Sequence, residues 1–236
     1  LMAEDVIRLL DSHIDAHDRD LLQLFLGRIR AWQEFMHEAR PDVLGKTAEI
    51  GLAGELLIVL RLLDTGVPAL VVLGAWEGPL GGLHDFAFGS GAIEVKATAS
   101  THGFPASVGS MEQLDPLLVT PLYLAAVRFK TGEQGATLSE MVADVAGRAA
   151  ESPGAGAALE TLLLRAGFLN AHAGQYGNRF QEVATRFMLV DSDFPGLHRG
   201  CVATPVTRIQ YEIDLDLVPH NDCGLGEALE ALGVVK

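Results

Sequence analysis

The sequence has little cysteine and lacks long apolar runs. Two cysteines, Cys201 and Cys223, occur in 236 residues, which excludes a disulfide framework and a cysteine-rich zinc site. Neither has a histidine arrangement typical of a catalytic thiol, so no thiol chemistry is expected. The longest apolar runs, near residues 56–60 and 66–75, are far shorter than the roughly 20 residues of a membrane-spanning helix. With no basic and apolar leader pattern at the start, we expect a cytoplasmic protein without a membrane partner.

Basic residues are also scarce. Acidic residues outnumber them 31 to 17, and the formal net charge is −14. This charge excludes a protein that holds duplex DNA through a general basic surface. It leaves open a local basic strip, or a basic partner subunit, as the source of phosphate contacts. Four arginines in the last third of the chain are candidates for such contacts, with ion pairing to the surplus acids as the default expectation: Arg179, Arg186, Arg199 and Arg208.

Apolar residues make up 49% of the chain, which is enough to bury a sizeable core. Their helical spacing predicts one or two amphipathic helices within residues 3–38 and a largely apolar helix over 47–63. A β-rich run at 69–76 and a hairpin at 84–97 follow. Further strands and helices are predicted at 117–129, 138–150, 157–166, 187–190 and 207–215. This order predicts an α/β core with helices on both faces of a sheet.

The hairpin HDFAFGSGAIEVKA, residues 84–97, carries charges where a strand would normally bury apolar side chains. Side chains alternate along a strand, so Glu94 and Lys96 share a face. A two-residue turn places Asp85 opposite Glu94 or Lys96, depending on which residues form the turn. All three charged groups then project from the same face. A three-residue turn would need a bulge to achieve this.

Carboxylates that project together repel each other, and a hard divalent cation is the strongest compensation. Glu55 is the lone acid in the apolar stretch 50–60, where burial is costly unless the carboxylate is paired or bound to a metal. Glu55 is therefore a natural third acid. Mg²⁺ commonly uses one or two carboxylates together with water and phosphate oxygens. The ammonium of Lys96 beside such an ion could orient or deprotonate a water that attacks a phosphodiester.

The order of these residues resembles the PD-(D/E)XK nuclease pattern: a helix acid at Glu55, an aspartate at Asp85, and Glu-x-Lys at Glu94 and Lys96. His84 precedes Asp85 where the nominal motif has proline. A narrower resemblance, to uncharacterised bacterial PD-(D/E)XK-motif proteins of restriction and phage-defence loci, rests on the segments GLAGEL, HDF with the preceding W and GG, EVKAT, SMEQLDPL and RIQYEIDL. The resemblance covers roughly residues 47–217.

The resemblance implies a restriction-endonuclease-like core, with a central mixed β-sheet flanked by helices. Residues 1–46 would form an N-terminal helical extension, and 47–236 the nuclease-like domain. It implies that Asp85, Glu94 and Glu55 bind Mg²⁺, with Mn²⁺ as a substitute, and that Lys96 assists water activation. DNA is the implied substrate. Other subunits of a defence system, or a second copy of the chain, are the implied partners.

Two further residues are candidates beside the acids. Gln113 in SMEQLD is expected either to contact a phosphate or hold Lys96, or to be an ordinary polar residue at a helix start. His84 adjoins Asp85 and could support it, with a half-buried structural histidine as the alternative.

Two functions remain open at this point. The first is a Mg²⁺-dependent DNA endonuclease, or a nuclease subunit, of a bacterial restriction or phage-defence system. The second is a catalytically inactive nuclease-fold module that mediates protein interaction within such a complex, which the net charge of −14 favours. An enzyme acting on a small molecule is disfavoured because the sequence has no cofactor fingerprint.

Overall fold

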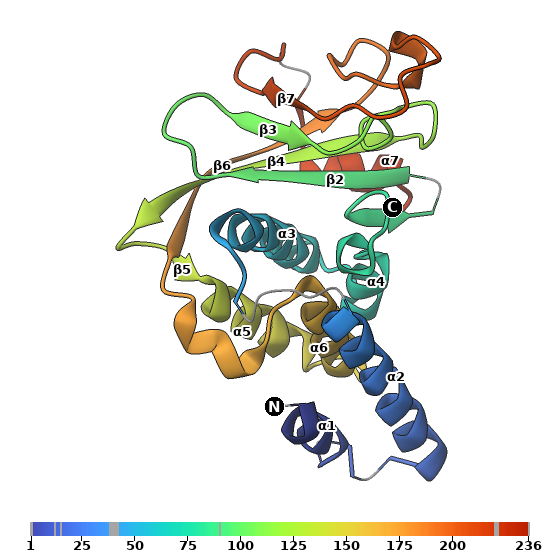
Figure 1. Cartoon of the computed structure of the whole chain (residues 1–236), viewed down its shortest axis with the longest axis vertical. Helices are drawn as coiled ribbons and strands as arrows, with labels where there is room; N and C mark the ends of the chain where they lie inside the picture. Colours follow the sequence, from blue (N-terminus) through green and yellow to red (C-terminus); the bar gives the residue numbers. More distant parts are fainter. Residues whose placement is uncertain are drawn as a thin grey trace.

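A mixed β-sheet with strand order β1-β2-β4-β6-β5 forms the centre of the molecule, and β8 pairs with β6 (Figure 1). Strands β2 and β4 run parallel, whereas the other paired strands of this sheet run antiparallel. The mixed sheet predicted from the sequence is therefore confirmed. The structure is a computed structural model that describes residues 2–11, 13–14, 16–37, 43–89, 91–219 and 222–235.

The sheet strands are β1 (Phe86–Phe88), β2 (Gly91–Thr98), β4 (Leu122–Gly132), β5 (Ala136–Thr137), β6 (Arg179–Leu189) and β8 (Asp222–Cys223). A separate antiparallel pair is formed by β3 (Pro105–Val108) and β7 (Tyr211–Asp214). The helices are α1 (Met2–Asp11), α2 (Asp18–His37), α3 (Lys46–Asp64), α4 (Ala69–Ala75), α5 (Leu138–Ala149), α6 (Ala155–Ala166) and α7 (Leu225–Ala231). Short 3₁₀ turns are η1 (Gly78–Leu80), η2 (Asn170–Gln175) and η3 (Arg199–Cys201).

Helix α3 lies between the sheet and α5, in contact with both β2 and α5 (Figure 1). Its sequence is apolar nearly all round because both of its sides are covered. Leu56, Ile58 and Leu62 are fully buried there, and Ile93 of β2 belongs to the same core. Burial of this kind stabilises the fold by roughly 1.5–3 kcal/mol for each large apolar side chain. Glu55 on α3 is thereby held close to the sheet.

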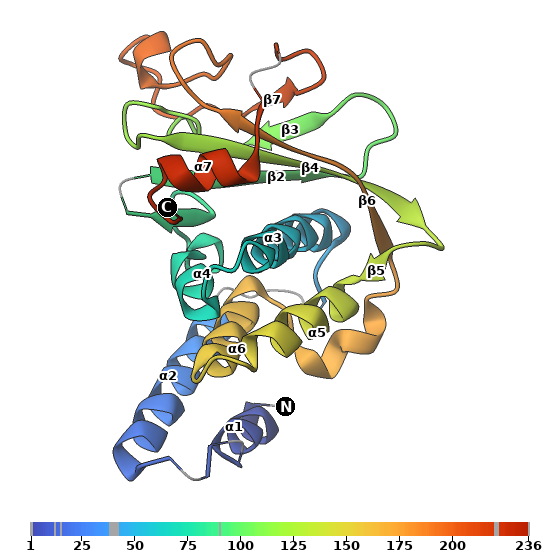
Figure 2. The same ribbon diagram turned by 180° about the vertical axis from the view of Figure 1, so that it is seen from behind.

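The opposite face of the sheet is covered mainly by the β3–β7 pair and adjoining loops. A second core there joins Phe104 and Val108 to Leu124 and Met188. Figure 2 shows α7 in front of β2 and β4, and Leu229 of α7 belongs to the same core as the buried residues of α3. The prediction of helices on both faces therefore holds for one face, and β structure covers the other.

Residues 69–76 differ from the prediction of a β-rich run, because 69–75 form helix α4. A short apolar run with β-branched residues cannot be assigned from its periodicity alone. Here Pro68 stands at the helix N-cap, and Ala69, Val72 and Leu73 recur at helical spacing on the buried side. Tertiary burial thus overrides β propensity. Residues 111–114, before β4, form turns.

Helices α1 and α2 contact each other, and α2 packs on α6. Trp32 of α2 and Leu164 of α6 share a small core there. Among the residues that the structure describes, no helix combines the length and apolar character needed to cross a membrane.

Two glycines of α3 provide a matched test of the packing between α3 and β2. A Cβ on Gly54 would lie 2.5 Å from the Cβ of Ala97, whereas a Cβ on Gly51 would meet nothing within 4 Å. We expect Gly54→Ala to lower the free energy of unfolding by about 1–3 kcal/mol through overpacking. Gly51→Ala should raise it by about 0.5–1 kcal/mol through helix propensity. Urea denaturation followed by circular dichroism measures both, and equal effects would contradict the close approach of α3 to β2.

Candidate functional site

The hairpin register brings Asp85 across from Glu94. Phe86 pairs with Ile93 and Phe88 pairs with Gly91, which leaves two residues between the strands. Continuing that register by one residue places Asp85 opposite Glu94, one of the two arrangements predicted from the sequence. Ser90 lies outside the described residues.

Backbone hydrogen bonds hold Asp85 from two sides. The backbone N–H of Val95 donates to Asp85 Oδ2 at 2.7 Å. The backbone N–H groups of Glu77 and Gly78 donate to the backbone carbonyl of Asp85 at 2.8 and 3.0 Å. Asp85 is thereby fixed to β2 on one side and to the segment after α4 on the other.

Glu55 reaches the same place from α3. The indole N–H of Trp76, a fully buried residue, donates to Glu55 Oε2 at 2.7 Å. A Cβ on Gly78 would lie 2.8 Å from both Asp85 Oδ1 and Glu55 Oε2. The two carboxylates therefore converge on the backbone of Gly78, where any side chain would displace them. This is a close approach that only glycine permits.

Glu94 and Lys96 form a direct ion pair on β2. Lys96 Nζ lies 2.7 Å from Glu94 Oε1, and Glu94 is only 2% exposed. The other carboxylate oxygen, Oε2, is buried without a hydrogen-bond partner. Lys96 also donates to Gln113 Oε1 at 3.2 Å, and that oxygen accepts the backbone N–H of Gly109 at 2.9 Å. Gln113 thus joins Lys96 to the loop after β3.

Burial raises the pKa of all three acids. The pKa of Glu94 rises to about 8, mainly because the side chain is buried and then because Asp85 lies nearby. The pKa of Glu55 also rises to about 8, for the same two reasons, while the Trp76 hydrogen bond opposes the rise. Burial likewise raises the pKa of Asp85. The single ammonium of Lys96 offsets the cost of charging these buried acids only in part, so their protonated forms are favoured.

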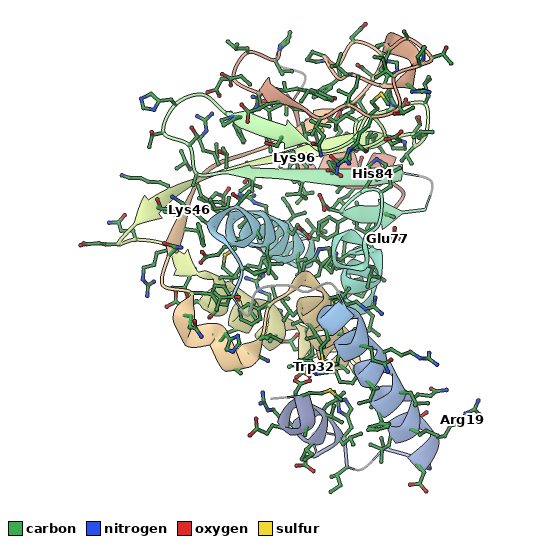
Figure 3. All side chains as sticks on the ribbon, viewed as in Figure 1. Arg19, Trp32, Lys46, Glu77, His84 and Lys96 are labelled. Carbon is green, nitrogen blue, oxygen red and sulfur yellow. The ribbon has the colours of Figure 1, made fainter. Side chains whose placement is uncertain are left out.

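His84 is buried next to Asp85, and its Nε2 has no hydrogen-bond partner. Burial lowers its pKa, so the imidazole is neutral at pH 7. Figure 3 places His84, Lys96 and Glu77 in one region beside β2, away from Trp32 on α2. The structure thus brings Glu55, Asp85, Glu94, Lys96, Gln113 and His84 together.

The acids do not form a ready-made metal cage. Within the part of the chain that the structure describes, no three Asp, Glu, His or Cys side chains are grouped so that they could hold one ion. Glu94 is instead paired with Lys96. The donor chemistry nevertheless suits a hard cation, because the carboxylates of Asp85 and Glu55 converge and Glu94 keeps a buried, unpartnered oxygen.

Sequence reasoning assigned no role to Trp76 or Gly78. Trp76 holds Glu55 through its indole N–H, and Gly78 gives the space in which Glu55 and Asp85 meet. The tryptophan before HDF entered only as part of a resemblance, whereas Gly78 was not among the residues quoted for it. Their roles depend on how α4 and η1 return the chain to β1.

The candidate phosphate-binding arginines are largely engaged within the protein. Arg179 pairs with Glu140, and Arg186 pairs with Asp222. Arg199 donates to the backbone carbonyls of residues 204 and 206. Arg208 is exposed. Ion pairing, the default expectation, therefore holds for the first two.

The raised pKa of Glu55 makes stability depend on pH. Its pKa is about 8 in the folded chain against an ordinary value of 4.5, so the folded state holds the proton more tightly. This contribution to stability is complete below about pH 4.5 and is lost as the pH rises through 8. Glu55→Gln keeps an acceptor for Trp76 and cannot ionise. It should raise the free energy of unfolding by about 1–2 kcal/mol at pH 9 and much less at pH 5.

Urea denaturation at pH 5, 7 and 9 measures this difference. Glu133→Gln, at an exposed position between β4 and β5, is the control and should leave stability unchanged at each pH. A gain from Glu55→Gln that is the same at pH 5 and pH 9 would show that the carboxyl does not titrate as described.

Comparison with known proteins agrees with this geometry. The family described as "Putative PD-(D/E)XK family member (DUF4420)" matches residues 1–216, a range that includes α3, the hairpin and all six candidate residues. No curated protein and no solved structure matches the chain. Since the family match covers most of the sequence and the acids of its motif meet in space, the chain belongs to this PD-(D/E)XK family.

Proposed function

We propose that this protein is a metal-dependent nuclease that hydrolyses phosphodiester bonds in DNA, with Mg²⁺ as its ion and Mn²⁺ as a substitute. The observation that carries the proposal is the convergence of Glu55, Asp85 and Glu94 around Lys96. Membership of a PD-(D/E)XK family supports nuclease chemistry in general terms. The choice of DNA, of Mg²⁺ and of endonucleolytic cleavage belongs to the proposal.

Asp85 and Glu94 would hold the ion, with Glu55 as the auxiliary acid. A bound Mg²⁺ would supply positive charge that stabilises a phosphoryl oxygen and lowers the pKa of a water. The fit rests on the unpartnered Oε2 of Glu94 and on the convergence of Asp85 Oδ1 with Glu55 Oε2. These oxygens are hard ligands of the kind that Mg²⁺ prefers. The pKa values of Glu55 and Glu94 are raised by burial and by the nearby Asp85, so a cation bound beside these acids would favour their charged forms.

Lys96 would act on the attacking water. Its ammonium is held between Glu94 Oε1 and Gln113 Oε1, which restricts a flexible side chain to one region. Gln113 is itself fixed by the Gly109 N–H. Lys96 would orient the water or exchange a proton with it, while Gln113 acts as a positioning residue. Trp76 would likewise act as a positioning residue, because its indole N–H donates a hydrogen bond to Glu55.

The negative charge of the chain bears on how DNA would be held. Arg179 and Arg186 are already paired with acids, which leaves few cations of the last third for phosphates. We propose that other subunits of a restriction or phage-defence system, or a second copy of the chain, contribute phosphate contacts. The nuclease would then act within an assembly.

The Glu94–Lys96 pair also favours one competing function. An ion pair that neutralises the acid and the amine needs no metal, as in a nuclease fold that mediates protein interaction without catalysis. Metal binding separates the two functions, because such a module has no carboxylate-dependent affinity for Mg²⁺ or Mn²⁺.

We expect Mg²⁺ or Mn²⁺ at millimolar concentration to raise the thermal midpoint of the full chain by a few °C, because a ligand that binds only the folded state stabilises it. Asp85→Asn, which keeps an acceptor for the Val95 N–H, should abolish the shift. Glu133→Gln should retain it. Differential scanning calorimetry with and without EDTA measures the effect, and an equal shift in the Asp85 variant would place the ion elsewhere.

We expect the full chain, with its genomic neighbours where they are needed, to cleave plasmid DNA when Mg²⁺ or Mn²⁺ is present. Lys96→Ala and Asp85→Asn should lower the rate by about 10²-fold or more, since each removes a group from the site of reaction. Lys130→Ala, at an exposed lysine near the end of β4, is the matched control and should keep full activity.

Gel assays of nicked and linear plasmid measure this activity. Cleavage that survives the Lys96 and Asp85 changes would contradict the assignment of the site. Metal binding that depends on Asp85, without cleavage in any combination of partners, would favour the non-catalytic module.

A further inference from the structure

A second cluster of reactive side chains lies outside the acid site. Cys201 Sγ is 3.0 Å from His198 Nε2, within hydrogen-bonding distance for a thiol and an imidazole. The sequence showed no histidine arrangement typical of a catalytic thiol, and the structure adds that His198 is a direct neighbour of Cys201. The reason is local, since η3 begins directly after His198 and a 3₁₀ turn brings side chains three residues apart onto the same side.

A carboxylate faces the far side of the imidazole. Asp115 Oδ1 lies 3.9 Å from His198 Nδ1, and Asp115 is buried, with the Leu117 N–H donating to the same oxygen at 3.0 Å. The Gly200 N–H donates to Nδ1 at 3.3 Å, so Nδ1 is the acceptor and Nε2 carries the ring hydrogen. The ring is thus held in place by neighbours on its Nδ1 side while Nε2 is directed at the sulfur. The Nε2–H directed at the sulfur can donate a hydrogen bond to the thiolate and so stabilise it.

The two cysteines differ in solvent exposure, so the reactivity of Cys201 can be compared with that of Cys223 in the same protein. Cys201 is exposed, so a small reagent can reach its sulfur. Cys223 on β8 is partly buried, and burial raises the pKa of its thiol. Burial raises the pKa of the Tyr211 phenol, and the nearby Cys201 is a smaller cause of the same rise. The surroundings of Cys201 are therefore polar and accessible, as reactive thiols require.

We propose that Cys201 is a reactive thiol, activated by His198, that is modified by small soft electrophiles of the alkyl halide and peroxide classes. With a peroxide, the sulfur attacks one oxygen, an S–O bond forms and the O–O bond breaks. The sulfur attacks as the thiolate, whose proton has passed to water, and the departing oxygen takes a proton from water, so that it leaves as water when the oxidant is hydrogen peroxide. Cysteine is oxidised to the sulfenic acid and the peroxide is reduced. This assignment is independent of the nuclease function.

Alkylation of the full chain with limiting iodoacetamide at pH 7 tests the activation, with each cysteine followed by peptide mass spectrometry. Exposure alone cannot make a thiol react faster in the folded chain than in the unfolded chain. We expect Cys201 to react about 10-fold faster in the native protein than in urea, because a thiolate-stabilising neighbour is present only in the folded state. Cys223 should react more slowly when folded. A native Cys201 rate equal to or below the unfolded rate would overturn the proposal.

A histidine variant identifies the activating group. His198→Gln should lower the native Cys201 rate about 5–10-fold, while the Cys223 rate and the circular dichroism spectrum stay unchanged. His102→Gln, at another exposed loop histidine, is the control and should have no effect. With hydrogen peroxide in place of iodoacetamide, a sulfenic-acid trap such as dimedone should label Cys201 in the wild type and not in His198→Gln. Equal labelling of both proteins would remove His198 from the reaction.

Discussion

Three carboxylates and one ammonium share a small and largely buried space, and this imbalance of charge is the constraint on which the site depends. Glu94 is almost wholly buried beside Lys96, while Glu55 and Asp85 converge on Gly78. Burial of like charges costs free energy, so the surrounding fold must hold them together. The apolar packing of α3 against β2 stabilises this arrangement, and the indole N–H of Trp76 holds Glu55 in place.

The hairpin shows how much of such a site can be predicted from the sequence. Alternation along a strand and a short turn are local rules, so they place Asp85, Glu94 and Lys96 on one face before any coordinates are known. Glu55 was predictable for a different reason, because a lone acid in an apolar helix must have a partner. The mixed sheet and the long helix α3 follow from equally strong patterns.

What could not be predicted depends on contacts between distant segments. Residues 69–75 form a helix because their burial against α3 and α6 outweighs the β-branched composition. The roles of Trp76 and Gly78 require that the chain return from α4 to the start of β1. The covering of the second sheet face by β3 and β7 joins segments about a hundred residues apart, and no local pattern specifies that pairing.

The loop between β3 and β4 carries one residue of each chemical centre. Gln113 touches Lys96, and Asp115, two positions further on, faces His198. Because Gln113 and Asp115 are only two residues apart, a movement of the backbone that shifts the contact of Gln113 with Lys96 also shifts the contact of Asp115 with His198. An insertion or deletion there would displace both contacts in one step, so the acid site and the thiol site depend on the same loop length.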